Sequence, residues 1–384
     1  MPEAVDVAVV GGGVIGLSVA RELRLAGVDR VVVLEREASV GQGSSSRANG
    51  GVRAQFTTRA NIQFSAFSIA ELERLEAATG LLGFHQTGYL LLCGTAAGEE
   101  GLADAFTLQR SLGVDVRWLD PAEALAMVPF LRPDGLRAAT FHARDGFLDP
   151  HGVVAALRGE AERLDVPILT GVEVTAIEPA SGGVLDVGTG DRTLRAQVVV
   201  NAAGPAAGRV AALCGVDLPV APVRRNLAYV REPDPGPLIP MCVDLDTGVL
   251  ARREASGGFV VAWSDPDDPS SWDTGVDPRF LEQLAARVGN RFPLLEDLPL
   301  DPRQCWAGLY PETPDHHAVI GPDPDLPALV HCAGFGGHGV MHAPAAGRAV
   351  AELVSTGSCA TFDLHRLRPS RFAEGDLVVE TAVL

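Results

Sequence analysis

The chain has 384 residues, 47% of them hydrophobic, and a formal net charge of −18. This length and composition indicate a globular protein with a large core, organised as two interleaved domains more readily than as one. The negative charge argues against nucleic-acid and anionic-membrane partners, because both would be repelled by most of the surface. All 31 basic residues are arginine, so chemistry that needs a lysine, such as Schiff-base formation, is excluded.

The cysteines and histidines show no pattern that would bind a metal or form a disulfide framework. No CxxC pair occurs, and no histidine is spaced from another histidine or a carboxylate as metal ligands are. The N-terminus shows no signal-peptide pattern, and no run of about 18 apolar residues could span a membrane. We therefore expect a cytoplasmic protein without a metal site. The six cysteines are Cys93, Cys214, Cys242, Cys305, Cys332 and Cys359.

The first elements are predicted to be a strand, a helix and a second strand, over residues 1–36, with a glycine-rich turn after the first strand. Gly11 allows the sharp turn, Gly13 lets a pyrophosphate approach the backbone, and Gly16 lets the helix pack close to the sheet. Glu35 ends the second strand, 19 residues after Gly16 (35 − 16), where a carboxylate can accept bonds from ribose hydroxyls. Because strand, helix and acidic residue all agree with the motif, the sequence predicts a dinucleotide site.

After residue 36, segments with the predicted helices and strands of a nucleotide-binding domain alternate with inserted segments. Between residues 40 and 144 it reads as a Gly/Ser loop, a helix, a strand and two further helices. A helix, a strand, a β-meander and a buried strand that stops at Gly204 follow. Residues 216–300 have the mixed pattern of an inserted domain. The predicted helices cover residues 62–75, 102–112, 120–128, 151–164, 278–292 and 344–355, and the predicted strands include 84–93, 168–178, 196–201, 223–230, 247–253, 258–263 and 328–333.

A second glycine loop, Gly334 to Gly339, lies between a predicted strand and the helix that starts at Pro344. It lacks a downstream ribose carboxylate, so it is not a second dinucleotide motif. The N-terminus of a helix stabilises negative charge. In a flavoprotein the N1–C2=O edge of the ring, which becomes negative on reduction, would suit this position. A turn that only permits close packing is the alternative.

Five stretches together resemble one family. They are the GGGVIG motif at 11–16, the Ser44–Arg53 loop, Asn-Ala-Ala-Gly-Pro at 201–205, Trp306–Asp315 and the Gly334–Gly339 loop. The chain resembles the D-amino-acid oxidase superfamily, in its glycine oxidase and sarcosine oxidase branch, from about residue 4 to Arg371. The resemblance implies an α/β fold: a Rossmann-like FAD-binding domain of the two-dinucleotide-binding type, with an inserted antiparallel β-sheet substrate domain.

The resemblance also implies domain boundaries and cofactor residues. The FAD-binding domain would comprise residues 1–80, 145–215 and 305–384, and the substrate-binding domain residues 81–144 and 216–304. The cofactor would be FAD, held without a covalent bond because Gly308 and the Ser44–Ser46 run stand where covalent members present Cys or His. The residues expected to bind FAD are Gly11, Gly13, Val14, Ile15, Gly16, Glu35, Arg36, Ser44, Ser45, Asn49, Gly50, Val172, Ala203, Gly204, Gly308, Gly336, Gly337, His338, Gly339, Val340 and Met341.

Three residues are expected at the catalytic centre: Arg53, Tyr310 and His338. Arg53 falls where sarcosine-oxidase-like sequences place a carboxylate-binding arginine, and an arginine fork suits that task. Tyr310 matches an active-site tyrosine of monomeric sarcosine oxidases and replaces the carboxylate-binding arginine of glycine oxidases. The lysines that help oxygen react in sarcosine oxidases are missing, so either another cation, such as His338 or an arginine, takes that role or the electrons leave to a different acceptor. An ordinary surface or phosphate-facing Arg53 and a packed core Tyr310 are the alternatives. The substrate clamp could also fall to Arg252 and Arg253, a pair that we expect to be solvated.

The function implied is oxidation of the C–N bond of an amino acid or N-substituted glycine, by hydride transfer to flavin N5 and hydrolysis of the imine. The partners would be a small amine substrate and O2 as acceptor. A homo-oligomer or a partner subunit is possible on this reading. Two other readings stay open: a flavoprotein subunit of an amino-acid dehydrogenase complex or assembly factor, and an NAD-dependent dehydrogenase.

Overall fold

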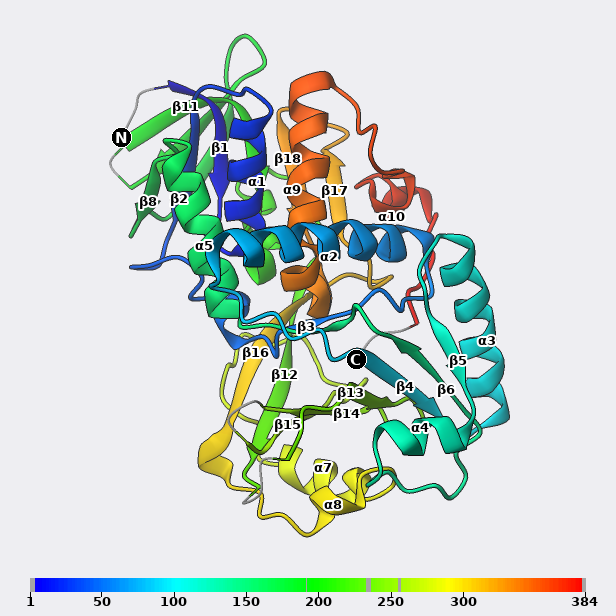
Figure 1. The fold of residues 1–384 in the computed structure, drawn as a ribbon. Helices are drawn as coiled ribbons and strands as arrows, with labels where there is room; N and C mark the ends of the chain where they lie inside the picture. Colours follow the sequence, from blue (N-terminus) through cyan, green and yellow to red (C-terminus); the bar gives the residue numbers. More distant parts are fainter. Residues whose placement is uncertain (1–3, 191, 233–235, 255–256, 382–384) are drawn as a thin grey trace.

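The computed structural model describes residues 4–190, 192–232, 236–254 and 257–381, drawn in colour in Figure 1. Within these residues the strands form two sheets of eight strands each and one two-stranded sheet. The two large sheets occupy opposite ends of the molecule (Figure 1). Among the described residues, no helix combines the length and apolar character needed to cross a membrane.

The first sheet has a parallel centre in the order β17-β18-β11-β1-β2-β8. Only β17 runs antiparallel in that row, and β9 and β10 extend β11 as an antiparallel meander. This is the doubly wound arrangement that the N-terminal motif predicts. The strands are β1 (Ala4–Val10), β2 (Val31–Glu35), β8 (Ile168–Thr170), β9 (Ala176–Pro179), β10 (Leu185–Thr189), β11 (Arg192–Asn201), β17 (Val319–Pro322) and β18 (Leu329–Ala333).

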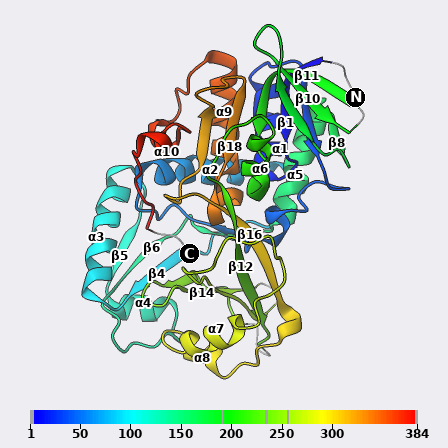
Figure 2. The same cartoon turned by 180° about the vertical axis from the view of Figure 1, so that it is seen from behind.

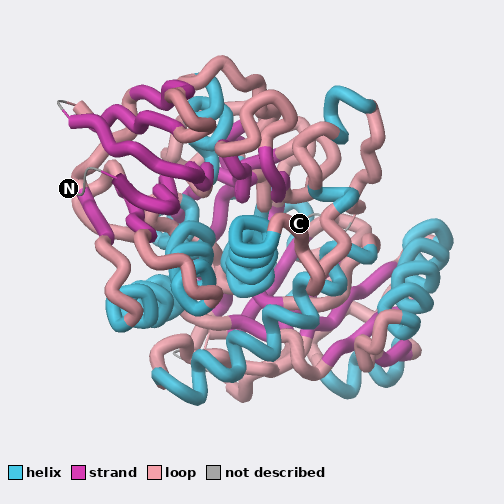
Figure 3. Tube along the Cα trace, turned by 90° about the horizontal axis from the view of Figure 1, so that it is seen from above, coloured by secondary structure: helices cyan, strands magenta, loops and turns pink. Residues whose placement is uncertain are grey.

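Both faces of this sheet are covered, which explains why its strands are almost wholly apolar. Val7 and Val9 of β1 point to one face, where they join a core with side chains from helices α1, α5 and α9. Ala8 and Val10 point to the other face, against the meander and α6. Figures 2 and 3 show this layering from behind and from above. The helices are α1 (Val14–Leu25), α2 (Arg59–Thr79), α5 (Pro150–Arg163), α6 (Ala207–Ala212) and α9 (Gly339–Thr356), with α2 crossing the end of α9.

The second sheet has the order β16-β12-β15-β14-β13-β4-β6-β5. It is antiparallel except for β13 and β4, which pair in parallel where the two inserted segments meet. Helices α4, α7 and α8 cover its outer face. The strands are β4 (Tyr89–Cys93), β5 (Arg117–Leu119), β6 (Ala138–His142), β12 (Ala221–Val230), β13 (Met241–Asp244), β14 (Val249–Arg253), β15 (Phe259–Trp263) and β16 (Cys305–Glu312). The helices are α3 (Ala96–Ser111), α4 (Pro121–Met127), α7 (Phe280–Val288), α8 (Pro293–Glu296) and, in the first domain, α10 (Arg371–Glu374).

The strand β16 links the two sheets. Its residues belong to the segment 305–384 that we predicted in the FAD-binding domain, yet its hydrogen bonds join β12 in the second sheet. The chain then returns to the first sheet through β17. The two-stranded sheet of β3 (Gly51–Val52) and β7 (Gly146–Phe147) lies between the large sheets (Figure 1).

Some element boundaries differ from the sequence prediction. We expected a helix to start at Pro344, but α9 begins at Gly339 and contains that proline. The glycine loop turns directly into the helix through a 3₁₀ turn at Gly336–His338, and Pro344, the sixth residue of α9, costs the helix one backbone hydrogen bond. The prediction of one continuous strand over residues 168–178 was wrong, because this stretch forms two strands: β8 ends at Thr170 and β9 starts at Ala176.

Candidate functional site

A cavity of about 490 Å³ runs between the two glycine loops, from the carboxyl end of β1 to β12 and β16. Most of the residues predicted to bind the cofactor line it, although they come from segments up to 329 positions apart (340 − 11). Those lining residues are Gly11, Gly13, Val14, Ile15, Glu35, Arg36, Ser44, Ser45, Asn49, Gly50, Val172, Ala203, Gly204, Gly308, Gly336, Gly337, Gly339 and Val340.

Three of the predicted residues lie outside that lining. Gly16 faces the turn instead, and a Cβ there would overlap the carbonyl oxygen of Gly11. This glycine therefore lets helix α1 approach the sheet, as the motif predicts. His338 and Met341 line a second, smaller cavity next to the first.

One end of the large cavity has the groups that an adenosine diphosphate needs. Glu35, 9% exposed, accepts hydrogen bonds from the backbone N–H of Gly12 (2.7 Å) and of Glu37 (2.9 Å), which hold its carboxylate at the end of β2. Ser45 Oγ accepts a bond from the N–H of Val14 (3.2 Å) at the start of α1. A hydroxyl at a helix N-terminus and a fixed carboxylate suit a phosphate and a ribose, respectively.

At the other end, the glycine loop before α9 lies against Tyr310. A Cβ added to Gly337 would come within 2.6 Å of Tyr310 Cε2, so only glycine allows this contact. The N-terminus of the 18-residue helix α9 directs its free N–H groups toward this end of the cavity. Two backbone cradles, a carboxylate and a cavity within the size range of cofactor sites together fit FAD.

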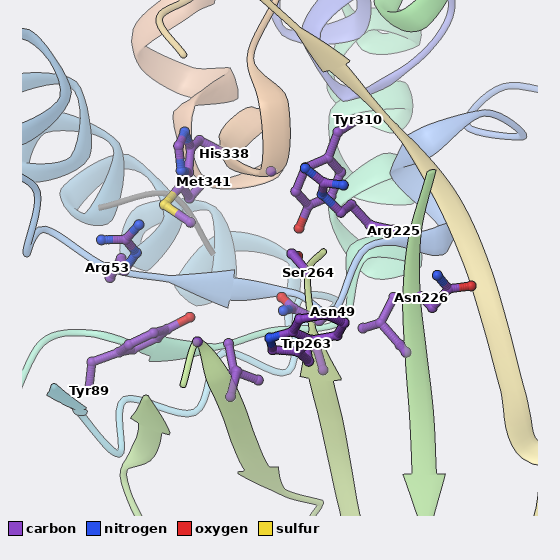
Figure 4. Close-up of a pocket in the computed structure, with 15 residues that line it drawn as sticks. Asn49, Arg53, Tyr89, Arg225, Asn226, Trp263, Ser264, Tyr310, His338 and Met341 are labelled. Carbon is purple, nitrogen blue, oxygen red and sulfur yellow. The ribbon is translucent and has the colours of Figure 1, made fainter. Parts of the chain in front are cut away.

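The smaller cavity, about 40 Å³, adjoins the ring end of the large one (Figure 4). The two cavities share the lining residues Asn49, Arg225, Leu227, Tyr310 and Gly337. Among its described lining residues there is no aspartate or glutamate. They are Asn49, Arg53, Tyr89, Arg225, Asn226, Leu227, Gly248, Leu250, Ala262, Trp263, Ser264, Tyr310, Gly337, His338 and Met341.

Arg53 is a buried cation at this cavity. Its side chain is 2% exposed, its Cζ lies 3.9 Å from the centre of the Phe56 ring, and Nη1 donates to the Gln55 carbonyl. Burial lowers its pKa, while nearby Glu380 and Asp145 act in the opposite direction. An arginine remains charged even so. The predicted position of Arg53 near the ring end therefore coincides with a site able to bind a carboxylate.

Two tyrosines direct hydroxyl groups at the same cavity (Figure 4). Tyr310 lies on β16, and burial raises its pKa against the effect of the Arg225 charge. Burial also raises the pKa of Tyr89, on β4. Both phenols are therefore neutral at physiological pH and can donate a hydrogen bond to a substrate.

His338 is neutral in the free protein. Its ring packs edge-on to Phe56, with centroids 4.8 Å apart, and lies 5.8 Å from the ring of His342. Burial, assisted by the charge of Arg53, lowers its pKa well below 6.5. We expected a cation such as His338 or an arginine to replace the missing lysine. Its burial argues against His338 as that cation, and Arg53 and Arg225 are the arginines that line the smaller cavity.

Several lining residues were missed by sequence reasoning. Tyr89, Arg225, Ser264 and Trp263 lie on or next to strands of the second sheet, far from any motif. The only signal in the sequence was the Arg224-Arg225 pair on a predicted strand. Because successive side chains of a strand point to opposite faces of the sheet, one of the two arginines must face each side.

Comparison with known proteins agrees with this geometry. A family model described as "FAD dependent oxidoreductase" (DAO) matches residues 6–353. "FAD-dependent oxidoreductase domain-containing protein 1" of Bos taurus is 33% identical, over 100% of this chain and 88% of the relative. "Glycine oxidase" of Geobacillus kaustophilus is 31% identical, over 95% and 96%.

Among solved structures, L-proline dehydrogenase from P. horikoshii is similar with a TM-score of 0.92 at 28% identity. The alignment covers 98% of this chain and 100% of that one. The match extends over both sheets, so the whole architecture, and not only the nucleotide-binding half, is shared.

Proposed function

Because the chain belongs to the DAO family of FAD-dependent oxidoreductases, we propose that it oxidises the C–N bond of a small amino acid or an N-substituted glycine. The expected resemblance to this family is confirmed by the family match and by the glycine oxidase relative. FAD bound between the two glycine loops would supply the acceptor for a hydride from the carbon next to the nitrogen, and the imine would hydrolyse in water.

The observation that carries this proposal is the buried guanidinium of Arg53 in a small cavity beside the ring end of the cofactor site. An arginine side chain can clamp a carboxylate through two parallel N–H groups, and an amino acid carries such a carboxylate. The neutral hydroxyls of Tyr89 and Tyr310 can hold the same carboxylate or the nitrogen. The small volume favours substrates of few atoms.

The described residues of this cavity supply no general base. No aspartate or glutamate lines it. His338 is a poor base, because burial strongly lowers its pKa and its ring packs edge-on against Phe56. Orientation of the substrate C–H is then the main contribution of the protein. We expect the amine to react as the neutral form, so the rate constant for reduction should rise with pH through the pKa of the bound amine.

We further propose that FAD is held without a covalent bond and that O2 is the acceptor. Gly308 and Ser44 line the cavity where covalent members present Cys or His. Relatives include both a glycine oxidase and an L-proline dehydrogenase, so the alternative is a dehydrogenase that passes electrons to another acceptor or to a partner subunit. An NAD-dependent dehydrogenase is the reading that the family match argues against.

The test is an anaerobic titration of the purified yellow protein with glycine, sarcosine, proline and longer N-carboxymethyl amines. We expect the oxidised flavin band to bleach with at least one of them. Arg53→Met should weaken the apparent binding of that amine by about 100-fold or more, whereas Arg303→Met, at an exposed arginine, should leave it unchanged. A protein that binds FAD and is reduced by none of these amines would refute the proposal. Comparing turnover in oxygen and with an artificial dye then distinguishes oxidase from dehydrogenase.

A further inference from the structure

A second arginine, Arg225, lies at the point where the two cavities meet. It stands on β12, its exposed fraction is 9%, and it lines both cavities. Figure 4 shows its side chain extending from the strand to Tyr310, and its Cζ lies 5.8 Å from the centre of that ring. The charges of both Arg225 and Arg53 lower the pKa of the Tyr310 hydroxyl, against the larger opposite effect of burial.

The hydrogen bonds of Arg225 leave one edge of the guanidinium available. Those that it makes with described residues all start from Nη1, to the carbonyls of Arg224 (3.2 Å) and Asp265 (3.2 Å) and to Asp268 Oδ2 (3.4 Å). Nε is buried and has no partner among the described residues. A carboxylate binds an arginine through two parallel N–H groups, and Nε with Nη2 form such a fork.

The neighbouring arginine shows what a structural role looks like on this strand. Arg224 points to the other side of β12, where Nη1 donates to Asp273 and Nη2 to Asp277, each at 2.8 Å. It lines neither cavity. Arg225, in contrast, has one ion pair, at 3.4 Å, and lines both cavities, although the Nε atoms of both arginines are buried without a partner among the described residues. A buried donor without a partner costs stability unless a ligand satisfies it.

We propose that Arg225 binds a second acidic group of the substrate, so that the preferred substrates are amines with two carboxylates, such as iminodiacetate or an N-carboxymethyl amino acid. This inference rests on the proposed function. Arg53 holds the carboxylate next to the reacting carbon, and Arg225 holds the one on the other arm of the nitrogen. The two arginines, which line the smaller cavity together with Tyr310, match the two charges of such a substrate.

Binding of unreactive analogues to the FAD-loaded protein tests this without depending on catalysis. Diglycolate and methoxyacetate replace the nitrogen with oxygen and differ in the second carboxylate. Their dissociation constants can be measured at 0.15 M salt from the shift of the flavin spectrum and by calorimetry. We expect diglycolate to bind at least about tenfold more tightly. Arg225→Met should abolish this ratio, Arg225→Lys should keep part of it, and Arg224→Met should preserve it.

Equal binding of the two analogues by the unchanged protein would overturn the inference. So would an Arg225→Met variant that keeps its FAD and melting temperature and retains the tenfold ratio. If Arg225→Met instead loses FAD, Arg225→Lys decides: a ratio that stays at tenfold refutes recognition through the Nε–Nη2 fork of Arg225. Flavin bleaching by sarcosine without a preference for diglycolate rejects this inference alone. A diglycolate preference without bleaching by any amine rejects the proposed function and supports the two-carboxylate site.

Discussion

Replacing Gly337 with alanine should damage the ring end of the cofactor site in a way that can be calculated from the structure. The new Cβ would lie 2.6 Å from Tyr310 Cε2 and 2.7 Å from its Cζ. Carbon atoms in contact are normally about 3.5–4.0 Å apart, so the ring or the loop must move by roughly 1 Å. Gly337 does not have a positive φ, so the backbone accepts alanine and the effect is purely steric.

The expected magnitude follows from two general relations. Overpacking of this size costs about 1–3 kcal/mol of folding stability. A displacement of about 1 Å at a reacting centre lowers the rate by about 100-fold. Urea denaturation measures the first effect, and the rate of anaerobic flavin reduction by the amine substrate measures the second. Gly159→Ala is the control, because its Cβ would have no atom within 4 Å and alanine stabilises a helix interior by up to about 1 kcal/mol.

A double-mutant cycle identifies the cause. In a Tyr310→Ala background the ring is gone, so Gly337→Ala should cost less than about 0.5 kcal/mol. A cost of the same size with and without the ring would show that the Gly337–Tyr310 contact is not the origin. Unchanged stability and reduction rate in the single variant would refute the steric reasoning altogether.

Three further predictions concern buried titratable side chains. Arg371→Met should lower the free energy of unfolding in urea by about 3–5 kcal/mol, because it leaves Asp315, bonded at 2.8 and 2.9 Å, without its partner. Burial raises the Asp315 pKa but Arg371 outweighs it, so this contribution, present above about pH 4, should disappear as the pH falls through the lowered pKa. His342, whose pKa burial lowers from 6.5 to about 3, binds a proton below pH 6.5 only when unfolded, so its contribution to stability should fall by about 2 kcal/mol between pH 7 and 5. Because burial also lowers the pKa values of His338, His317 and His331, His342→Gln should reduce the pH slope in melting experiments by that amount and leave the rest. Glu380→Gln should lower the melting temperature, by a loss of about 1–3 kcal/mol, because its amide would face the donors of Thr57, Thr58 and Asn61; an unaltered melting curve would contradict the importance of that buried carboxylate.

The sequence predicts best what neighbouring residues determine. The first glycine turn and Glu35 depend on a single β-α-β unit, and they line the cavity as the motif implies. Gly336 to Val340 could be placed for the same reason, since a glycine loop at a helix start is a local feature. The fold class followed from these motifs and from the resemblance they support.

The residues that require long-range pairing could not be found this way. Arg225 reaches the site only because β12 pairs with β16 and β15, and no local pattern indicates which face of the strand meets the cavity. Tyr89 depends on the parallel pairing of β4 with β13, strands about 150 positions apart. The charge state of His338 depends on burial beneath Phe56, which is also absent from the sequence pattern.

The distribution of the cofactor cavity along the chain has a consequence for biosynthesis. Strand β1 pairs with β11, and β11 in turn pairs with β18, so the sheet edge stays open until more than 330 residues have left the ribosome. A cofactor that can bind only this late stabilises the completed chain but cannot guide the early steps of its folding. Cells short of riboflavin should therefore accumulate full-length, protease-sensitive chains rather than truncated folded ones.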